Sequence, residues 1–270
     1  MNVLDISGLT VRAGDSTLVD NISFVVKPGE RVGIIGESGS GKSITSLAAL
    51  GLLADSLVAT GSVRIEGREV IGTPDHEIRR LRGPAAQIVF QEPLTALDPL
   101  MRVERQIAEP LRRHLHLHGA ALRDAVREAL AEVSLTEPRI ARAYPFELSG
   151  GQRQRVAIAI ALAAHPRILI ADEPTTALDV TVQDGVLTLL ERLATDRGMA
   201  LLFISHDLAV VSRMVERLIV MRDGVAVEEG DVRAVLSTPK HPYTAALVAS
   251  ARALDAAWDA ATPGTERESS

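Results

Sequence analysis

The chain has 270 residues, of which 46% are hydrophobic and 24% charged, and its formal net charge is −6. This composition is ordinary for a soluble globular protein, and the acidic balance disfavours non-specific binding to nucleic acid. The absence of cysteine excludes disulfides, thiolate zinc sites and iron–sulfur clusters.

The N-terminal half predicts alternating strands and helices. Alternating apolar residues predict half-buried strands at 3–11 and 22–26, and a continuous apolar run predicts a buried strand at 32–35. A glycine-rich turn and a helix at 42–53 follow, then strands at 61–65 and 86–90. Helix-forming residues dominate 103–133, with a break near Gly119.

The C-terminal half continues this alternation. We expect helices at 151–164, at 180–196 and near Leu208, and strands at 168–171, 200–204, 218–221 and 225–228. The alternation predicts an α/β fold with a mostly parallel central sheet, an N-terminal antiparallel β part and an inserted helical lobe. No basic-then-apolar leader follows Met1, and the longest apolar runs, such as 156–164, are shorter than the roughly 20 residues that span a membrane.

The glycine-rich turn GESGSGKS fills every fixed position of the phosphate-loop motif GxxxxGK[ST], between a buried strand and a helix. We expect the backbone N–H groups of residues 37–43 to surround phosphates, Lys42 to reach the β and γ oxygens, and Ser43 to bind Mg²⁺. The plain alternative is a turn that only docks a helix on a sheet. The expected nucleotide-binding residues are Gly36, Glu37, Ser38, Gly39, Ser40, Gly41, Lys42, Ser43 and Ile44.

The segment ILIADE is an apolar strand that ends in two acids. Asp172 is placed to hold Mg²⁺ or its water, and Glu173 to orient a water that attacks the γ-phosphate. The alternative is an acidic helix N-terminus, which is common for an Asp-Glu pair. The phosphate loop in the same chain favours the catalytic interpretation.

A second anion site is expected at LSGGQ. Ser149 reads as the N-cap of an apolar helix, and Gly150 and Gly151 let a ligand approach the free N–H groups near Gln152. One chain would then carry two phosphate-binding elements more than a hundred residues apart.

These motifs resemble those of the ATP-binding-cassette ATPases. In order, the chain has GESGSGKS, Gln91 at the start of QEPLTALDP, LSGGQ, ILIADE, Ala177-Leu178-Asp179, and His206 in ISHD, which together span about residues 3–240. The resemblance implies a P-loop NTPase fold that binds ATP and Mg²⁺. It also implies a dimer in which each ATP lies between the phosphate loop of one subunit and LSGGQ of another.

The resemblance assigns further roles. Ser149 and Gly151 would touch the γ-phosphate bound by the partner subunit, and Asp179 would cross the dimer seam. Gln91 would sense Mg²⁺ and the attacking water, and His206 would hold the γ-phosphate beside Glu173. Plain alternatives are ordinary helix caps at Ser149 and Asp179 and a core histidine at His206.

The chain departs from the family pattern at Ala13, where an aromatic ring usually stacks on adenine. Loss of a stacked ring weakens binding by about 1–3 kcal/mol. We therefore expect this site to discriminate poorly between ATP and GTP.

Within the family, TTALDVTVQ and HPYTAALV resemble the ATPases of peptide and nickel importers. This implies a position at the cytoplasmic face of the cell membrane, beneath two membrane-spanning permease subunits and indirectly served by an extracytoplasmic solute-binding protein. A second ATPase subunit, identical or related, would complete the dimer, and nucleic acid is not an expected partner. Candidate permease contacts are Glu92, Leu94, Leu97 and Leu100, unless these leucines simply pack the lobe.

Residues 1–257 are expected to form one cassette domain. The nucleotide lobe would comprise about 1–91 and 165–240, the helical lobe about 92–164 and a C-terminal helix about 241–257, with a disordered tail at 258–270. Two rivals remain: a non-transport cassette in DNA repair or on the ribosome, and a scaffold that binds ATP without hydrolysing it. The chain has neither the long heptad insertion nor the second cassette of the former, and Lys42, Gln91, Glu173 and His206 are intact.

His114, His116 and His118 could suggest a nickel site. Residues two apart on a helix point about 200° apart, so metal binding by this tract is not expected. Arg153 and Arg155 beside LSGGQ are better explained as part of an exposed helix face than as a nucleic-acid contact.

Overall fold

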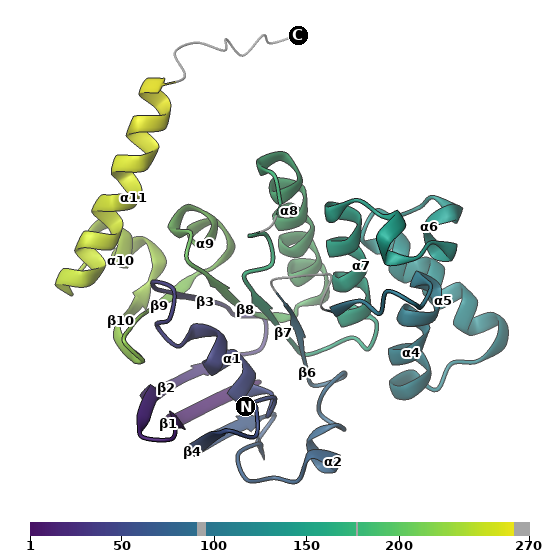
Figure 1. The fold of residues 1–270 in the computed structure, drawn as a ribbon, viewed down its shortest axis with the longest axis horizontal. Helices are drawn as coiled ribbons and strands as arrows, with labels where there is room; N and C mark the ends of the chain where they lie inside the picture. Colours follow the sequence, from purple (N-terminus) through teal and green to yellow (C-terminus); the bar gives the residue numbers. More distant parts are fainter. Residues whose placement is uncertain (91–95, 177, 262–270) are drawn as a thin grey trace.

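The computed structural model describes residues 1–90, 96–176 and 178–261. Within them, two β-sheets and a group of helices pack together (Figure 1). The strands are β1 Leu4–Ala13, β2 Ser16–Val26, β3 Arg31–Ile35, β4 Leu57–Ile65, β5 Arg68–Glu69, β6 Ala86–Val89, β7 Ile168–Asp172, β8 Ala200–Ser205, β9 Arg217–Arg222 and β10 Val225–Asp231.

The helices are named in the same way (Figure 1). They are α1 Lys42–Ala49, α2 Asp75–Ile78, α4 Val103–Leu115, α5 Gly119–Glu132, α6 Pro138–Arg142, α7 Gly150–Leu162, α8 Val180–Arg197, α9 Leu208–Met214, α10 Val232–Ser237 and α11 Pro242–Ala261, with a 3₁₀ turn at Pro145–Glu147. No helix among the described residues is long and apolar enough to cross a membrane.

The central sheet has the strand order β10-β9-β3-β8-β7-β6. Every neighbouring pair is parallel except β9 with β10, which form the expected hairpin. Parallel neighbours need crossover connections, and the helices between the strands supply them. The predicted mostly parallel sheet is therefore confirmed.

The N-terminal sheet is antiparallel, with the order β2-β1-β4-β5. Two of its strands begin earlier than the sequence predicted, because the additional residues pair with β1. Thr17 pairs with Arg12 at the start of β2, and Leu57 pairs with Ala13 at the start of β4.

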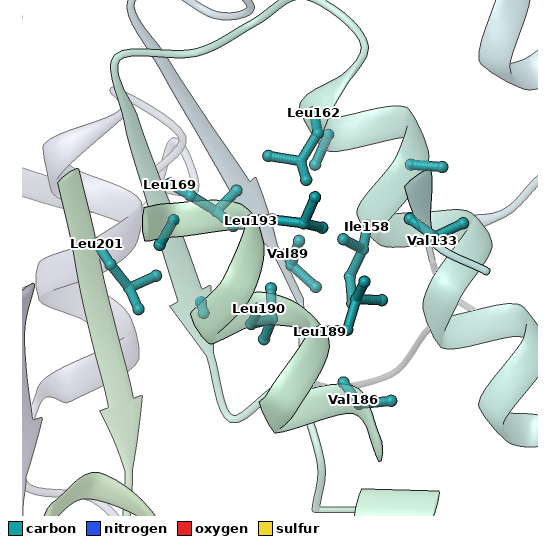
Figure 2. Close-up of a cluster of buried hydrophobic side chains, with 14 of the residues drawn as sticks. Val89, Val133, Ile158, Leu162, Leu169, Val186, Leu189, Leu190, Leu193 and Leu201 are labelled. Carbon is teal, nitrogen blue, oxygen red and sulfur yellow. The ribbon is translucent and has the colours of Figure 1, made fainter. Parts of the chain in front are cut away.

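The two faces of the central sheet bury different cores. On β8, Leu202 and Ile204 face α1 and the antiparallel sheet, whereas Leu201 and Phe203 face α8 and the helical group. This division follows from the alternation of side chains along a strand. Figure 2 shows part of the second core, which contains Leu190 and Leu193 of α8 together with Leu169 of β7.

The stretch expected to be helical at 103–133 divides into α4 and α5, as the break near Gly119 predicted. His116 ends α4 in the left-handed conformation, and His118 precedes α5 with an extended backbone. Together with α6 and α7, these helices form a group beside β6 and α8 (Figure 1). The short α6, begun by Pro138, was not predicted.

Two predicted helix ends are wrong by four residues each. The helix expected at 42–53 ends at Ala49, because Gly51 adopts the left-handed conformation and the Arg82 guanidinium binds the carbonyls of Leu50 and Gly51 at 2.8 and 2.6 Å. The helix expected at 241–257 continues to Ala261, into the range expected to be a disordered tail. It extends away from the two sheets (Figure 1).

Candidate functional site

The phosphate loop lies between β3 and α1, at the carboxyl end of a central parallel strand, where ligands of α/β sheets bind. Its glycines are structurally required. A Cβ on Gly36 would lie 2.1 Å from the Met221 carbonyl oxygen, and Gly39 and Gly41 have φ angles of 82° and 94°.

Several polar groups of this loop have no protein partner. Within the described part of the chain, no hydrogen bond occupies the N–H groups of Ser38, Gly39 or Gly41. The Ser40 hydroxyl is buried without a partner. Free N–H donors at a helix N-terminus suit an anion, so these residues fit a phosphate group.

The Glu37 N–H does not belong to this free set. It donates to the Tyr243 hydroxyl oxygen at 3.1 Å, and the Glu37 carbonyl accepts the Ser40 N–H at 3.2 Å. These bonds occupy the Glu37 and Ser40 donors, so the structure favours the other N–H groups of this segment for phosphate. The role expected for the whole segment from 37 to 43 stays a prediction.

Lys42 is the buried cation of the loop, only 4% exposed. Its ammonium donates to the carbonyl oxygens of Gly36 and Glu37 at 2.7 and 2.8 Å. Burial lowers the pKa of Lys42, against the attraction of Glu173 and Asp172. The cation is therefore held at the loop and is poorly solvated, which favours an anionic ligand.

Asp172 ends β7 beside the first turn of α1. Its two carboxylate oxygens accept from the Ser43 and Ser46 hydroxyls, each at 3.1 Å. Burial raises the pKa of Asp172, and the two serine hydrogen bonds oppose that rise. Carboxylate and hydroxyl oxygens are the ligand types that Mg²⁺ prefers, so Asp172 and Ser43 fit the expected metal position.

Glu173 follows in a conformation that its residue type rarely adopts, with φ at 47°. Its N–H donates to the Ile204 carbonyl at 2.9 Å, which ties it to β8. One carboxylate oxygen accepts from the Thr176 hydroxyl at 3.0 Å and lies 3.1 Å from Nδ1 of His206. The carboxylate is thus oriented by two side chains and stands near Lys42 and Asp172.

The LSGGQ segment begins α7 with the predicted cap. The Ser149 hydroxyl accepts the Gln152 N–H at 3.3 Å, and the Ser149 N–H donates to the Gln152 side chain at 3.1 Å. A Cβ on Gly151 would lie 2.5 Å from a methyl of Val182, so close packing against α8 also requires this glycine. Asp179 caps α8 by accepting the Val182 N–H at 3.0 Å.

The two phosphate-binding elements lie in different parts of the chain. Helix α1 packs against β1, β2, β4 and β7, whereas α7 packs against α4, α5, α8 and β6 (Figure 1). The structure therefore brings together Lys42, Ser43, Asp172, Glu173 and His206, and places Ser149 to Gln152 with the helical group.

Some expected residues lie outside the described part of the chain, namely Gln91, Glu92, Leu94 and Ala177. Of the other candidate permease contacts, Leu97 is buried at 3% exposure and Leu100 is 87% exposed. Ala13, the position without a stacking ring, is the last residue of β1. Its effect on adenine preference stays a prediction.

Sequence reasoning missed three residues at the site. Ser46 could have been found, since it lies one helical turn after Ser43 and so on the same face. Thr176 and Tyr243 had no such signal. Tyr243 is 206 residues from the backbone N–H that it binds.

Comparisons with known families give two matches. Residues 19–176 match the ABC transporter family, and residues 227–269 match the oligopeptide/dipeptide transporter C-terminal region. The first match contains the phosphate loop, LSGGQ and the acidic strand end. The second begins in β10 and contains Tyr243.

Curated relatives include a peptidoglycan transport ATP-binding protein, YejF, from Agrobacterium fabrum, 46% identical over 93% of this chain. The chain spans only 46% of that relative's length. A putative peptide import ATP-binding protein from Brucella ovis is 44% identical over 92% of this chain and 77% of its own length. The oligopeptide transport ATP-binding protein OppD of Escherichia coli is 45% identical over 90% of this chain and 72% of its own length.

Solved structures share the fold. A dimeric post-hydrolysis state of the ATP-binding cassette MJ0796, bound to ADP and Pi, has a TM-score of 0.74 at 33% identity, over 85% of this chain and 99% of that one. CbiO1 from Clostridium perfringens, part of the transporter complex cbiONQ, has a TM-score of 0.76 at 26% identity, over 88% of this chain and 91% of that one. The chain therefore belongs to the ABC transporter family, as one of its ATPase cassettes.

Proposed function

We propose that this chain is the ATP-hydrolysing subunit of a membrane importer that carries peptides. The match of residues 227–269 to the oligopeptide/dipeptide transporter C-terminal region supports the substrate class most directly. The names of the Brucella ovis and Escherichia coli relatives, a putative peptide import and an oligopeptide transport ATP-binding protein, agree with it. Nickel, the other substrate suggested by the sequence, has no such support.

The ATP site would use the residues that converge around the phosphate loop. The free N–H groups of Ser38, Gly39 and Gly41 and the Lys42 ammonium would bind the phosphates. Ser43 and Asp172, with Gln91, would hold Mg²⁺, which when bound neutralises phosphate charge. Glu173 would accept a proton from the attacking water, and His206, hydrogen-bonded to Glu173, would hold the γ-phosphate beside it.

Two subunits would enclose each nucleotide. In one chain, Ser149 to Gln152 are grouped with the helices and not with the phosphate loop. Ser149 and Gly150 are exposed, which leaves the start of α7 open to a second chain. We infer that this segment, with Asp179, binds the ATP held by the other subunit.

Coupling to transport would use the surface between a nucleotide lobe, about 1–91 and 165–240, and a helical lobe, about 92–164. The exposed Leu100 supports a contact there with one of two permease subunits. Leu97 is buried and packs the lobe instead. The complex would sit at the cytoplasmic face of the membrane, with an extracytoplasmic solute-binding protein serving the permeases.

Uptake by the reconstituted complex tests this function. The chain would be purified with its membrane subunits and binding protein, placed in vesicles, and supplied with ATP and either labelled oligopeptides or Ni²⁺. We expect ATP-dependent peptide uptake and none with Lys42→Ala, which removes the phosphate-binding cation. Uptake of Ni²⁺ but not peptides would overturn the substrate class, and ATP hydrolysis without uptake of either would overturn the role in import.

A further inference from the structure

The C-terminal helix α11 reaches the phosphate loop through one side chain. The Tyr243 hydroxyl accepts the Glu37 N–H at 3.1 Å, and Tyr243 is only 8% exposed. Tyr243 lies in the region that matches the oligopeptide/dipeptide transporter C-terminal region, whereas Glu37 lies in the ABC transporter match. The bond therefore joins the two matched parts of the chain.

The start of α11 is fixed by a carboxylate of β10. The two oxygens of Glu228 accept the N–H groups of Lys240 and His241, each at 2.9 Å. Burial opposes ionisation of Glu228, but the hydrogen bonds that its carboxylate accepts, these two foremost, and the attraction of His241 together lower its pKa. His241 then accepts the Tyr243 N–H through Nδ1 at 3.2 Å, so the tyrosine is presented from an anchored helix start.

The tyrosine ring also contacts a side chain of β9. The Arg222 guanidinium lies 5.0 Å from the ring centroid, in a cation–π contact. The turn after Arg222 also contacts the loop, because the Gly224 N–H donates to the Ser40 carbonyl at 3.3 Å. The phosphate loop therefore contacts two neighbouring parts of the chain. Helix α11 contributes the Tyr243 side chain, and the turn after β9 contributes the Gly224 N–H.

The peptide that Tyr243 holds carries one of the two carbonyls that position Lys42, and the next peptide carries the other. The Glu37 carbonyl accepts from the Lys42 ammonium at 2.8 Å, and the peptide between Gly36 and Glu37 contributes the carbonyl that accepts at 2.7 Å. The bond from Tyr243 fixes the orientation of that same Gly36–Glu37 peptide.

We propose that Tyr243 is a positioning residue of the nucleotide site, through which the C-terminal region sets the conformation of the phosphate loop. Tyr243 acts through Glu37 and Lys42 and has no contact with phosphate of its own. Because coupling between two sites is reciprocal, nucleotide bound at the loop also stabilises the docked start of α11.

The test compares Tyr243→Phe with Tyr144→Phe, which makes the same change at the chain's other tyrosine, in the helical group. Tyr243→Phe removes the hydroxyl and keeps the ring over which Arg222 lies. We expect about 3- to 10-fold weaker binding of a non-hydrolysable ATP analogue, the effect of one lost hydrogen bond. The Glu37 amide should exchange its hydrogen about tenfold faster, with a melting temperature close to that of the parent.

Tyr144→Phe should leave the analogue affinity and the Glu37 exchange at parent values. Parent affinity and parent exchange in Tyr243→Phe would overturn the proposal. An equal loss of affinity in both variants would also overturn it, because the effect would not be specific to the loop contact.

A measurement on the unaltered chain tests the proposal even if Tyr243→Phe folds poorly. Adding the analogue should slow hydrogen exchange in residues 242–250 of the parent. If the analogue binds and these amides exchange at an unchanged rate, the proposed coupling is absent. If the parent does not bind the analogue at all, the assigned ATP site fails instead.

Discussion

Glu173 occupies a strained backbone position at the end of β7. A left-handed conformation costs an L-residue about 1–2 kcal/mol, and the hydrogen bond from its N–H to Ile204 helps to hold it. In this backbone conformation the carboxylate contacts Thr176 and His206. Strain of this kind clusters at functional sites, which agrees with the role proposed for Glu173.

Glu173→Gln should leave ATP binding intact and reduce turnover by about 10²- to 10⁴-fold, because an amide of the same shape cannot take up a proton at neutral pH. The chain should then accumulate as a nucleotide-bound dimer. Phosphate release and size-exclusion chromatography with ATP measure the two effects. Glu128→Gln, an exposed position in α5, is the matched control, and parent-rate hydrolysis by Glu173→Gln would show that this carboxylate is not the base.

The buried carboxylate of Asp172, at the proposed metal position, lowers the stability of the folded chain when no metal is bound. Its pKa is raised by burial, so its ionised form is less favourable in the folded chain than in the unfolded one. Asp172→Asn should therefore raise the free energy of unfolding at neutral pH without ligand, and should lose most of the stabilisation that Mg²⁺ and ATP give the parent. Denaturant unfolding in EDTA and with Mg²⁺-ATP measures both, against Asp55→Asn, which changes an exposed turn.

At the scale of elements, Arg217 of β9 ties the two sheets together. Its guanidinium binds Glu30 at 2.8 Å, the Glu229 carboxylate of β10 and the Val25 carbonyl of β2. Although burial raises the pKa of Glu30, its hydrogen bonds and attraction to Arg217 outweigh that effect and lower it. The ion pair with Glu30, in the turn between β2 and β3, is therefore stabilising, and the hydrogen bond to Val25 joins the parallel sheet to the antiparallel one.

Arg217→Met should lower the free energy of unfolding by about 3 kcal/mol, because it leaves the partly buried Glu30 without its cation. In the parent, the lowered pKa of Glu30 contributes stability above about pH 4.5, which is lost as pH falls below that value. The variant should lose less stability over this acid range. Urea unfolding at neutral and acid pH tests both effects, and Arg113→Met, which breaks an exposed pair with Glu109, should cost less than about 1 kcal/mol.

At the scale of the whole molecule, the chain would hold half of each of two nucleotide sites in the proposed dimer. Its phosphate loop belongs to the sheets, and its LSGGQ segment belongs to the helical group. A mixture of two defective chains can therefore separate the proposed dimer from a site completed within one chain.

Ser149→Arg and Lys42→Ala chains should each be inactive alone and should regain ATP hydrolysis when mixed. In the mixed dimer, the intact loop of the first chain faces the intact LSGGQ segment of the second. A chain with both substitutions, mixed with parent chains, should form dimers in which neither site is complete. Melting temperatures check folding, since the lost cap at Ser149 costs about 1 kcal/mol. Full activity of Ser149→Arg alone would contradict the shared site.

The sequence by itself determined the features that depend on residues close together along the chain. The phosphate loop, the acidic end of β7, the caps at Ser149 and Asp179 and the mostly parallel sheet follow from local spacing, because backbone donors near helix starts and alternating apolar residues impose local requirements. Family membership follows from the order of these motifs.

Only the tertiary structure decided which distant groups meet. It ended α1 at Ala49 through Arg82, joined the sheets through Arg217, and gave the Glu37 N–H to Tyr243 instead of phosphate. The first contact depends on how the segment between α2 and β6 packs beside α1, and the other two depend on how β9 and α11 pack beside β2 and the phosphate loop. Because such packing is fixed by the whole topology and not by neighbouring residues, the local sequence could not specify it.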